Sequence, residues 1–305
     1  MAIDSNHMSA SEAAKLWGLS TRRVRQLCNQ FRIFKARRNE DGEWIIPRGA
    51  NPPVDERAFR YRKVPNHEKD LVRYLEAMIK EVRKLPPTDT EAWWHYFLLG
   101  ATYHMHTIKH AHVTRAQVFS IVNGDIPANC RRKDVAEVQN FAKALEAVRA
   151  AVHAKRRLTF TLFRELLLTM TGRKRMSGKW IRSEIDQQII EYLLEHARSK
   201  KLHPVIQAGD FLNEMHLRKP LTCHNEQIGY LIANFILMRN GYPPFIIYRV
   251  IFTTMRRYHE EWLRRLRRVG DIRHVVPPPQ QRRAFINACV IRATIRAINF
   301  LRFSH

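Results

Sequence analysis

The sequence is poor in cysteine and contains no long apolar run. Its four cysteines are dispersed over 305 residues without a Cys-x-x-Cys pair, which argues against a disulfide framework and indicates free thiols in a reducing cytoplasm. No stretch is apolar for long enough to span a membrane, and residues 1–8 lack the apolar core of a signal peptide. We therefore expect an intracellular protein in which residues 1–8 are a tail or the remnant of an expression tag.

Acidic residues are also scarce. Asp and Glu number 28 against 53 Lys and Arg, which gives a net charge of +25 and a pI near 10.6. This excess favours polyanions as partners, because neutralising phosphates releases condensed counterions. A charge that only keeps the protein soluble is the weaker interpretation. We expect DNA as the partner, RNA as the alternative, and a nucleoid-associated location in a bacterial-type cytoplasm.

Residues 9–50 have the pattern of a small DNA-binding domain. A helix is expected from the cap at Ser9 to Gly18, and a second one follows directly. Two short helices joined by a Gly-containing turn are typical of a helix-turn-helix. A polar turn at 39–42 between two extended runs predicts a two-stranded wing. The segment resembles the excisionase-like and MerR-like winged helix-turn-helix family.

The second of these helices carries the expected DNA contacts. Polar side chains early in a recognition helix approach base edges, while neighbouring arginines hold phosphates. The side chains expected at base edges are Thr21, Arg22 and Gln26, and those expected at phosphates are Arg23, Arg25, Arg37 and Arg38. A solvated charged face on a protein-interaction domain is the alternative.

Residues 219–247 combine a loop, an apolar helix and a Gly-Tyr-Pro-Pro stop. From Ile228 to Arg239 apolar residues cover almost the whole circumference of the expected helix, as in a buried central helix. Asn240-Gly241 supplies a left-handed cap, and the two prolines that follow prevent continuation. This helix is the strongest landmark in the sequence.

The same stretch resembles the core motif of the Fic/Doc family, which reads roughly HPFxDGNGRxxR before an apolar helix and a GYPP-like stop. In the family the histidine is a general base, the acidic residue holds a metal, and the Gly-rich turn with its arginine binds nucleotide phosphates. The aligned residues here are Lys219, Pro220, Cys223, Asn225, Glu226, Gln227 and Tyr230. Because a protonated lysine is a poor base, the resemblance implies a retained scaffold without catalytic residues, metal or cofactor.

Three other stretches extend the Fic resemblance. Residues 203–218 resemble the helix that leads into the Fic loop, and 170–181 resembles the hairpin that clamps target peptides. Residues 106–124 resemble the inhibitory helix, with Lys109 in place of the family's glutamate. The loss of that glutamate, together with the arginine replaced by Tyr230, implies that the inhibitory switch decayed with the site.

The remaining pattern is helical. Prolines and alternating charges over 51–66 predict an extended linker. Helices are expected over 67–85, from about 88, and near 114–122, 131–151, 158–170 and 183–199. The expected fold class is mainly α, with a small winged helix-turn-helix followed by an all-α Fic-like domain over 67–270 that contains a short β-hairpin.

A second basic region lies in the last third of the chain. Residues 201–305 hold 17 Lys and Arg against 6 Asp and Glu, and the paired arginines are Arg256, Arg257, Arg264, Arg265, Arg267 and Arg268. Contact with a nucleic-acid backbone, an acidic protein partner and a solvated face remain open. Residues 271–305 form a Pro-rich spacer and a basic amphipathic helix, which packs on the body, mediates dimerisation or lies on a membrane surface.

The histidines do not predict a metal site. Only His106 and His110 of the cluster over 104–112 share a helix face, and no carboxylate or thiol completes a shell. We therefore predict a sequence-specific DNA-binding protein, a dimer and a transcription regulator, whose inactive Fic-like domain serves dimerisation or partner binding. The alternatives are a Fic-type AMP transferase with an altered site and a nucleoprotein component without sequence preference.

Overall fold

The computed structural model describes residues 6–29, 33, 36–39, 41–50, 68–84, 87–108, 113–173, 180–181, 183–199, 202–248, 251, 253–254, 260 and 278–302. The linker expected at 51–66, Lys109 and the paired arginines between Arg256 and Arg268 lie outside these residues.

The N-terminal module consists of two helices and a small sheet. Its elements are β1 (His7–Ser9), α1 (Ala10–Trp17), α2 (Thr21–Asn29), β2 (Arg37–Arg38) and β3 (Trp44–Pro47). The strands are antiparallel in the order β1-β3-β2, with Met8 opposite Ile46 and Arg38 opposite Trp44. The two extended runs expected on either side of the polar turn form the paired strands β2 and β3, while their role as a wing stays a prediction. β1 was missed, because three residues directly before a helix cap are too few to show a period of two.

The turn between the two helices follows from local chemistry. Ser9 and Glu12 form a capping box, in which each side chain accepts a hydrogen bond from the backbone N–H of the other residue. Gly18 ends α1 in the left-handed region with φ of 65°, a conformation that costs glycine little. Ser20 then caps α2, because its Oγ accepts a 3.2 Å hydrogen bond from the Arg23 N–H. The module has a hydrophobic core of its own, which includes Val24, Leu27 and Ile46.

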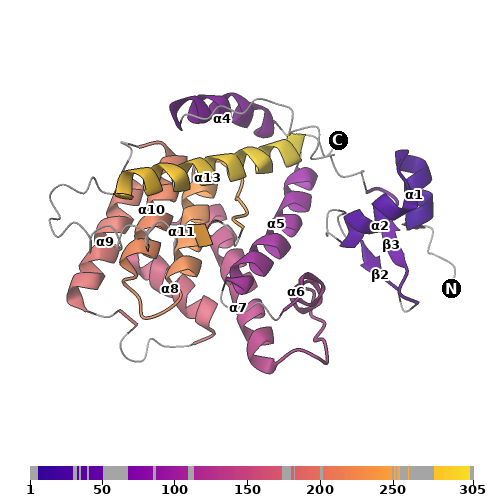
Figure 1. Cartoon of the computed structure of the whole chain (residues 1–305), viewed down its shortest axis with the longest axis horizontal. Helices are drawn as coiled ribbons and strands as arrows, with labels where there is room; N and C mark the ends of the chain where they lie inside the picture. The colour runs from indigo at the N-terminus through magenta and orange to yellow at the C-terminus, as the bar shows by residue number, and fades with distance from the viewer. Residues whose placement is uncertain are drawn as a thin grey trace.

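The rest of the described chain is a helical body (Figure 1). Its helices are α4 (Glu68–Val82), α5 (Pro87–Thr107), α6 (Arg115–Val122), α7 (Arg132–His153), α8 (Phe160–Thr171), α9 (Glu184–Arg198), α10 (Pro204–Arg218), α11 (Asn225–Arg239) and α13 (Pro278–Arg302). The expected fold class, mainly α with a small sheet, is confirmed. No helix among the described residues is long and apolar enough to cross a membrane.

The body is built around α10 and α11. From Ile228 to Leu237 every residue of α11 is buried, as the all-round apolar pattern predicts. The helix starts at Asn225, about one turn before its apolar run. The sequence pattern assigns this first turn to the loop because its residues are polar. Gly229 lets the two helices approach closely, because a Cβ at this position would lie 3.0 Å from Met215 Cβ.

The C-terminal helix α13 packs on the body. Its buried residues are Ile286, Asn287, Val290, Ile291, Ala293, Thr294, Ile295, Ala297, Ile298 and Leu301. It lies against α4, α5 and α10, and Figure 1 shows it crossing the body below α4. Arg283 on α13 binds Asp210 of α10 with two hydrogen bonds of 2.5 Å. Of the three roles left open by the sequence, packing on the body is the one observed.

Candidate functional site

The outer face of α2 is basic. Arg22, Arg25 and Gln26 are exposed, while Thr21 and Arg23 are half-buried. Arg23 Nη1 donates to Gln26 Oε1 at 2.9 Å, so these two side chains are held next to each other. α2 contains three arginines and no acidic residue. The opposite face packs into the module core, which fixes the direction of the exposed side chains.

Arg38 ties the hairpin to α2. Its Nη2 donates to Asn29 Oδ1 at 3.2 Å, and its Nη1 donates to the carbonyl of Gly42 at 3.3 Å. The guanidinium carbon lies 5.0 Å from the centre of the Trp44 ring, within the range of a cation–π contact. Arg38 was expected to hold a phosphate. Its geometry gives it a structural role as well, whereas Arg37 is simply exposed.

The motif loop, residues 219–225, connects α10 to α11. Lys219 ends α10 in the left-handed region with φ of 47°, and its side chain is exposed. His224 is also left-handed, with φ of 64°. Asn225 is buried and bonds the backbone of Leu221 twice, by accepting from its N–H and donating to its C=O, both at 2.9 Å. The loop therefore keeps a tight, defined shape.

An acidic side chain occupies the first turn of α11. Glu226 Oε1 lies 3.2 Å from Nδ1 of the buried His216. Burial raises the pKa of Glu226, but hydrogen bonds from His216 and from its own backbone N–H, with the charges of His216 and Lys219, bring it to about 2. A negative charge is thus fixed at the positive end of the α11 dipole.

The other two aligned positions on α11 are inside the protein. Tyr230 is fully buried, its hydroxyl donates to the Phe245 carbonyl, and burial raises its pKa. Gln227 is 7% exposed, and its Oε1 is buried without a hydrogen-bond partner. Oδ1 of Asn234, a residue that sequence analysis did not single out, accepts a 2.9 Å hydrogen bond from the backbone N–H of Phe245. Tyr230 is therefore a core residue.

The end of the expected hairpin pairs with the motif loop. Ile181 and Leu221 form an antiparallel bridge, and the Thr222 N–H donates to the Trp180 carbonyl at 2.9 Å. Arg173 lies over the Trp180 ring at 5.1 Å. α8 continues to Thr171 in place of the expected first strand, and residues 174–179 lie outside the described chain. The paired residues 180–181 bring a second segment to the loop, while the expected hairpin itself stays a prediction.

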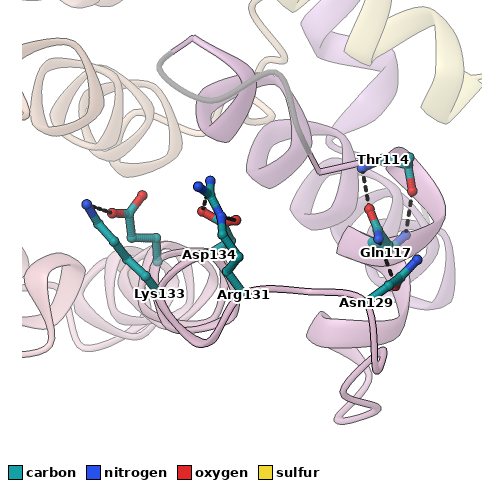
Figure 2. Close-up of polar contacts among 7 residues, drawn as sticks. Thr114, Gln117, Asn129, Arg131, Lys133 and Asp134 are labelled. Atoms are coloured by element: carbon teal, nitrogen blue, oxygen red, sulfur yellow. Dashed lines mark hydrogen bonds and ion pairs between the residues drawn. The ribbon is translucent and has the colours of Figure 1, made fainter.

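The segment expected to be an inhibitory helix includes α6 (Figure 2). Thr114 and Gln117 form a capping box at its start, and Gln117 Nε2 donates to Asn129 Oδ1 at 3.0 Å. The connection to α7 is fixed by Arg131, whose Nε donates to the buried Asp134 at 2.7 Å. Figure 2 shows these contacts along the segment that joins the two helices. These contacts join the N-cap of α6, α6 itself, the connection to α7 and the first turn of α7.

His104, the first histidine of the cluster, has the surroundings of a packed residue. Burial lowers the pKa of His104 to about 4, and the charge of Arg115 adds to this effect. Its ring meets the Tyr248 ring edge-on at 4.7 Å. His110 and His112 lie outside the described residues. Within the described ranges no three His, Cys, Asp or Glu residues are placed to hold a metal ion.

Sequence analysis missed a polar cluster at the other end of α10 and α11. His203 caps α10 by accepting from the Val205 N–H at Nδ1, so its Nε2 donates to Glu76 Oε1 at 2.8 Å. The Tyr242 hydroxyl donates to the same oxygen. Burial raises the pKa of Glu76, but these two hydrogen bonds outweigh it and lower the pKa overall. The cluster joins three distant segments, which no local pattern could reveal.

The fold resembles those of Fic proteins. A Fic-domain-containing signalling protein from Bacteroides thetaiotaomicron is 21% identical with a TM-score of 0.60, covering 76% of this chain and 97% of that one. Fic-1 from C. elegans is 16% identical with a TM-score of 0.60, covering 78% and 74%. A Fic family protein from Desulfovibrio desulfuricans is 15% identical with a TM-score of 0.51, covering 75% and 74%. No protein-family model and no curated protein matches the sequence.

Proposed function

We propose that the protein is a dimeric, sequence-specific DNA-binding regulator of the bacterial nucleoid, whose N-terminal module is a winged helix-turn-helix. The proposal rests on the residues at the outer face of α2. Arg22, Arg25 and Gln26 point outward from a helix that has no acidic residue and is anchored by its own core. A short helix of this kind fits the major groove, where such side chains meet base edges and phosphates.

The hairpin supports the same proposal. Arg38 bonds both Asn29 at the end of α2 and Gly42 in the turn of the hairpin, so the hairpin and the helix keep a fixed relation. Arg37 is exposed on the same strand. A recognition helix and a wing that are held together present one continuous basic surface, which suits a duplex because its phosphates flank the groove on both sides.

We further propose that the Fic-fold body has lost nucleotide transfer and serves dimerisation or partner binding. A helix N-terminus attracts phosphates, but here the ionised carboxylate of Glu226 already occupies the first turn of α11. Lys219 stands in the position of the family's base, and Cys223 in that of its metal ligand. Glu226 would repel a nucleotide phosphate at this helix end. Lys219 does not supply a general base, and Cys223 does not supply a carboxylate to hold a metal ion.

The first experiment is selection of bound duplexes from a random pool at near-physiological salt. We expect an enriched two-fold-symmetric site, and we expect Arg22→Ala or Gln26→Ala to reduce discrimination by about 1–3 kcal/mol per base contact. Lys15→Ala, which removes an exposed charge on α1, is the matched control and should keep the preference. Equal loss on selected and random duplexes would contradict sequence-specific binding and favour a nucleoprotein component.

The body is tested in the same preparation with labelled ATP. We expect no saturable binding and no label transfer, and we expect Lys219→His alone to restore neither, because Cys223, Glu226 and Tyr230 remain. Label transfer by the wild-type protein would replace the proposal with an active AMP transferase whose chemistry has moved to other residues.

A further inference from the structure

The turn between α7 and α8 is strongly basic. Between Glu146 and Glu165 the chain has five basic residues and no acidic one. One of the five, Arg149, is tied to α5, because it binds Glu91 and lies over the Trp94 ring. The other four are exposed, and we call them the α7–α8 corner: Lys155, Arg156, Arg157 and Arg164.

Two contacts fix the shape of the corner. Arg156 Nη1 donates to Glu165 Oε2 at 2.7 Å, which ties the turn to the second turn of α8. Leu158 is 5% exposed and packs into the main core, which anchors the turn from the inside. The other basic side chains of the corner therefore extend from a defined backbone.

Three of these cations have no partner in the described part of the fold. The side chains of Lys155, Arg157 and Arg164 form no hydrogen bond and no ion pair with any residue that the structure describes. The carboxylate of Glu165 is already bound to Arg156, and this hydrogen bond holds its pKa below the ordinary value. The three cations can therefore bind an anion from outside the body.

Lys155 has a backbone conformation that is unusual for lysine. It follows the end of α7 with φ of 52°. Its N–H donates to the Val152 carbonyl and the Arg156 N–H donates to the Ala151 carbonyl, both at 2.9 Å. These two hydrogen bonds form a Schellman motif, in which glycine is the usual residue at the left-handed position because it has no Cβ.

Other left-handed residues show what this position would ordinarily hold. α1 and α8 end at glycines, Gly18 and Gly172. Among the described residues only three left-handed ones are not glycine, and two of them, Lys219 and His224, belong to the motif loop. Lys155 is the third. A glycine there would form the same turn with less strain, so the strain points to a role for the lysine side chain.

We propose that the α7–α8 corner is a second, sequence-independent contact with duplex DNA, in which Lys155, Arg157 and Arg164 neutralise backbone phosphates. The inference rests on the DNA binding of the proposed function and gives the body a part in it. Lysine and arginine contacts with phosphates release counterions, and they raise the affinity for every sequence alike.

A solvated face that only aids solubility is the alternative. Such a face mixes charges of both signs, but on the body the signs are separated. α9 carries four acidic residues and one arginine, whereas the corner has four cations beside one carboxylate. Solubility also gives no reason to place a lysine at a left-handed position, since any exposed position would serve.

The side chains around the corner favour duplex DNA over other phosphate-bearing partners. Single-stranded RNA is usually held by aromatic side chains that stack on its bases, and a membrane surface takes up exposed apolar side chains. Phe163 is buried, and Phe160 is half-buried and stacked on it with ring centres 6.2 Å apart. The corner therefore offers charge, which suits the outside of a duplex.

The salt dependence of binding tests the contact. The full chain is titrated with the selected duplex and with a random duplex of equal length. Lys155→Gly, Arg157→Gln and Arg164→Gln combined should lower the slope of log K against log salt by about 2–3. The affinity should fall about tenfold for both duplexes, and the ratio of the two affinities should stay unchanged. Lys143→Gln, an exposed charge earlier on α7, is the matched control and should change neither slope nor affinity.

Lys155→Gly alone separates binding from folding. The melting temperature of the body should rise by about 2–4 °C, because glycine adopts φ of 52° without strain, while the affinity for both duplexes should fall. A rise in melting temperature without weaker binding would overturn the role of Lys155. Arg157→Lys keeps the charge and should bind like the wild-type protein, whereas Arg157→Gln should not.

The failure of this inference is distinguishable from the failure of the proposed function. Binding that depends on the corner without an enriched duplex would contradict sequence-specific recognition alone. An enriched duplex whose affinity and salt slope ignore the triple variant would overturn the corner alone. Loss of binding to single-stranded RNA or to phosphatidylserine vesicles, with duplex binding unchanged, would assign the corner to that partner and overturn the DNA contact.

Discussion

The carboxamide of Asn225 and the backbone of Leu221 close the motif loop with two hydrogen bonds of 2.9 Å, one in each direction. Both residues are buried. The pair satisfies an N–H and a C=O that belong to no helix, at the point where the chain turns from α10 into α11. Asn225 therefore fixes the shape of the loop by hydrogen bonding.

We predict that Asn225→Ala destabilises the body by about 2–4 kcal/mol, since it leaves one buried donor and one buried acceptor of Leu221 without partners. Urea unfolding followed by far-ultraviolet circular dichroism measures this change. Thr222→Ala, at an exposed position three residues earlier, should change the free energy of unfolding by less than about 0.5 kcal/mol. Similar values for the two variants would show that the loop does not depend on the carboxamide.

We predict that the protein loses stability in acid because of Glu226. Its folded pKa of about 2 lies below its ordinary value of 4.5, so its stabilising contribution is complete above about pH 4.5 and is lost as the pH falls towards 2. The shift corresponds to about 3 kcal/mol. Unfolding free energies measured at several pH values should fall more steeply for the wild-type protein than for Glu226→Gln. Parallel curves would mean that Glu226 is not held as an anion.

A further prediction separates the effect of the Arg38 charge from the effect of its hydrogen bonds and its contact with Trp44. Arg38→Lys keeps the positive charge but loses the forked hydrogen bonds to Asn29 and Gly42 and the planar contact with Trp44. We expect a loss of about 1 kcal/mol in the stability of the module and weaker DNA binding at all sequences. Arg37→Lys, on the same strand without these contacts, is the control. A thermal melt of the module unaffected by Arg38→Lys would contradict the structural role.

The contact between α10 and α13 predicts a large effect from a small change. A Cβ at Gly209 would lie 2.1 Å from Asn287 Oδ1 and 3.2 Å from its Cα, so Gly209→Ala must move the Asn287 carboxamide and press on the backbone of α13. We expect a loss of about 1–3 kcal/mol and faster hydrogen exchange in α13. Gly124→Ala, where no atom lies within 4 Å but φ is 99°, tests whether backbone strain alone gives the same loss without loosening α13.

Sequence patterns predicted the helices well because each carries its own signals. The apolar circumference of α11, the Ser9–Glu12 box and the glycine after α1 are all local. The parts that were missed depend on distant residues. Glu76, His203 and Tyr242 meet across 166 positions of sequence, and the first turn of α11 is helical although its residues are polar. The DNA contacts stay predictions.

The two hydrophobic cores have a consequence for folding. Among the described residues, the core of the N-terminal module and the main core of the body have no member in common, so we expect each to be a cooperative unit whose unfolding does not expose the apolar surface of the other. Heating should then give two transitions, and a substitution such as Asn225→Ala should move only one of them. The N-terminal module can then stay folded under conditions in which the helical body has already unfolded, or the reverse.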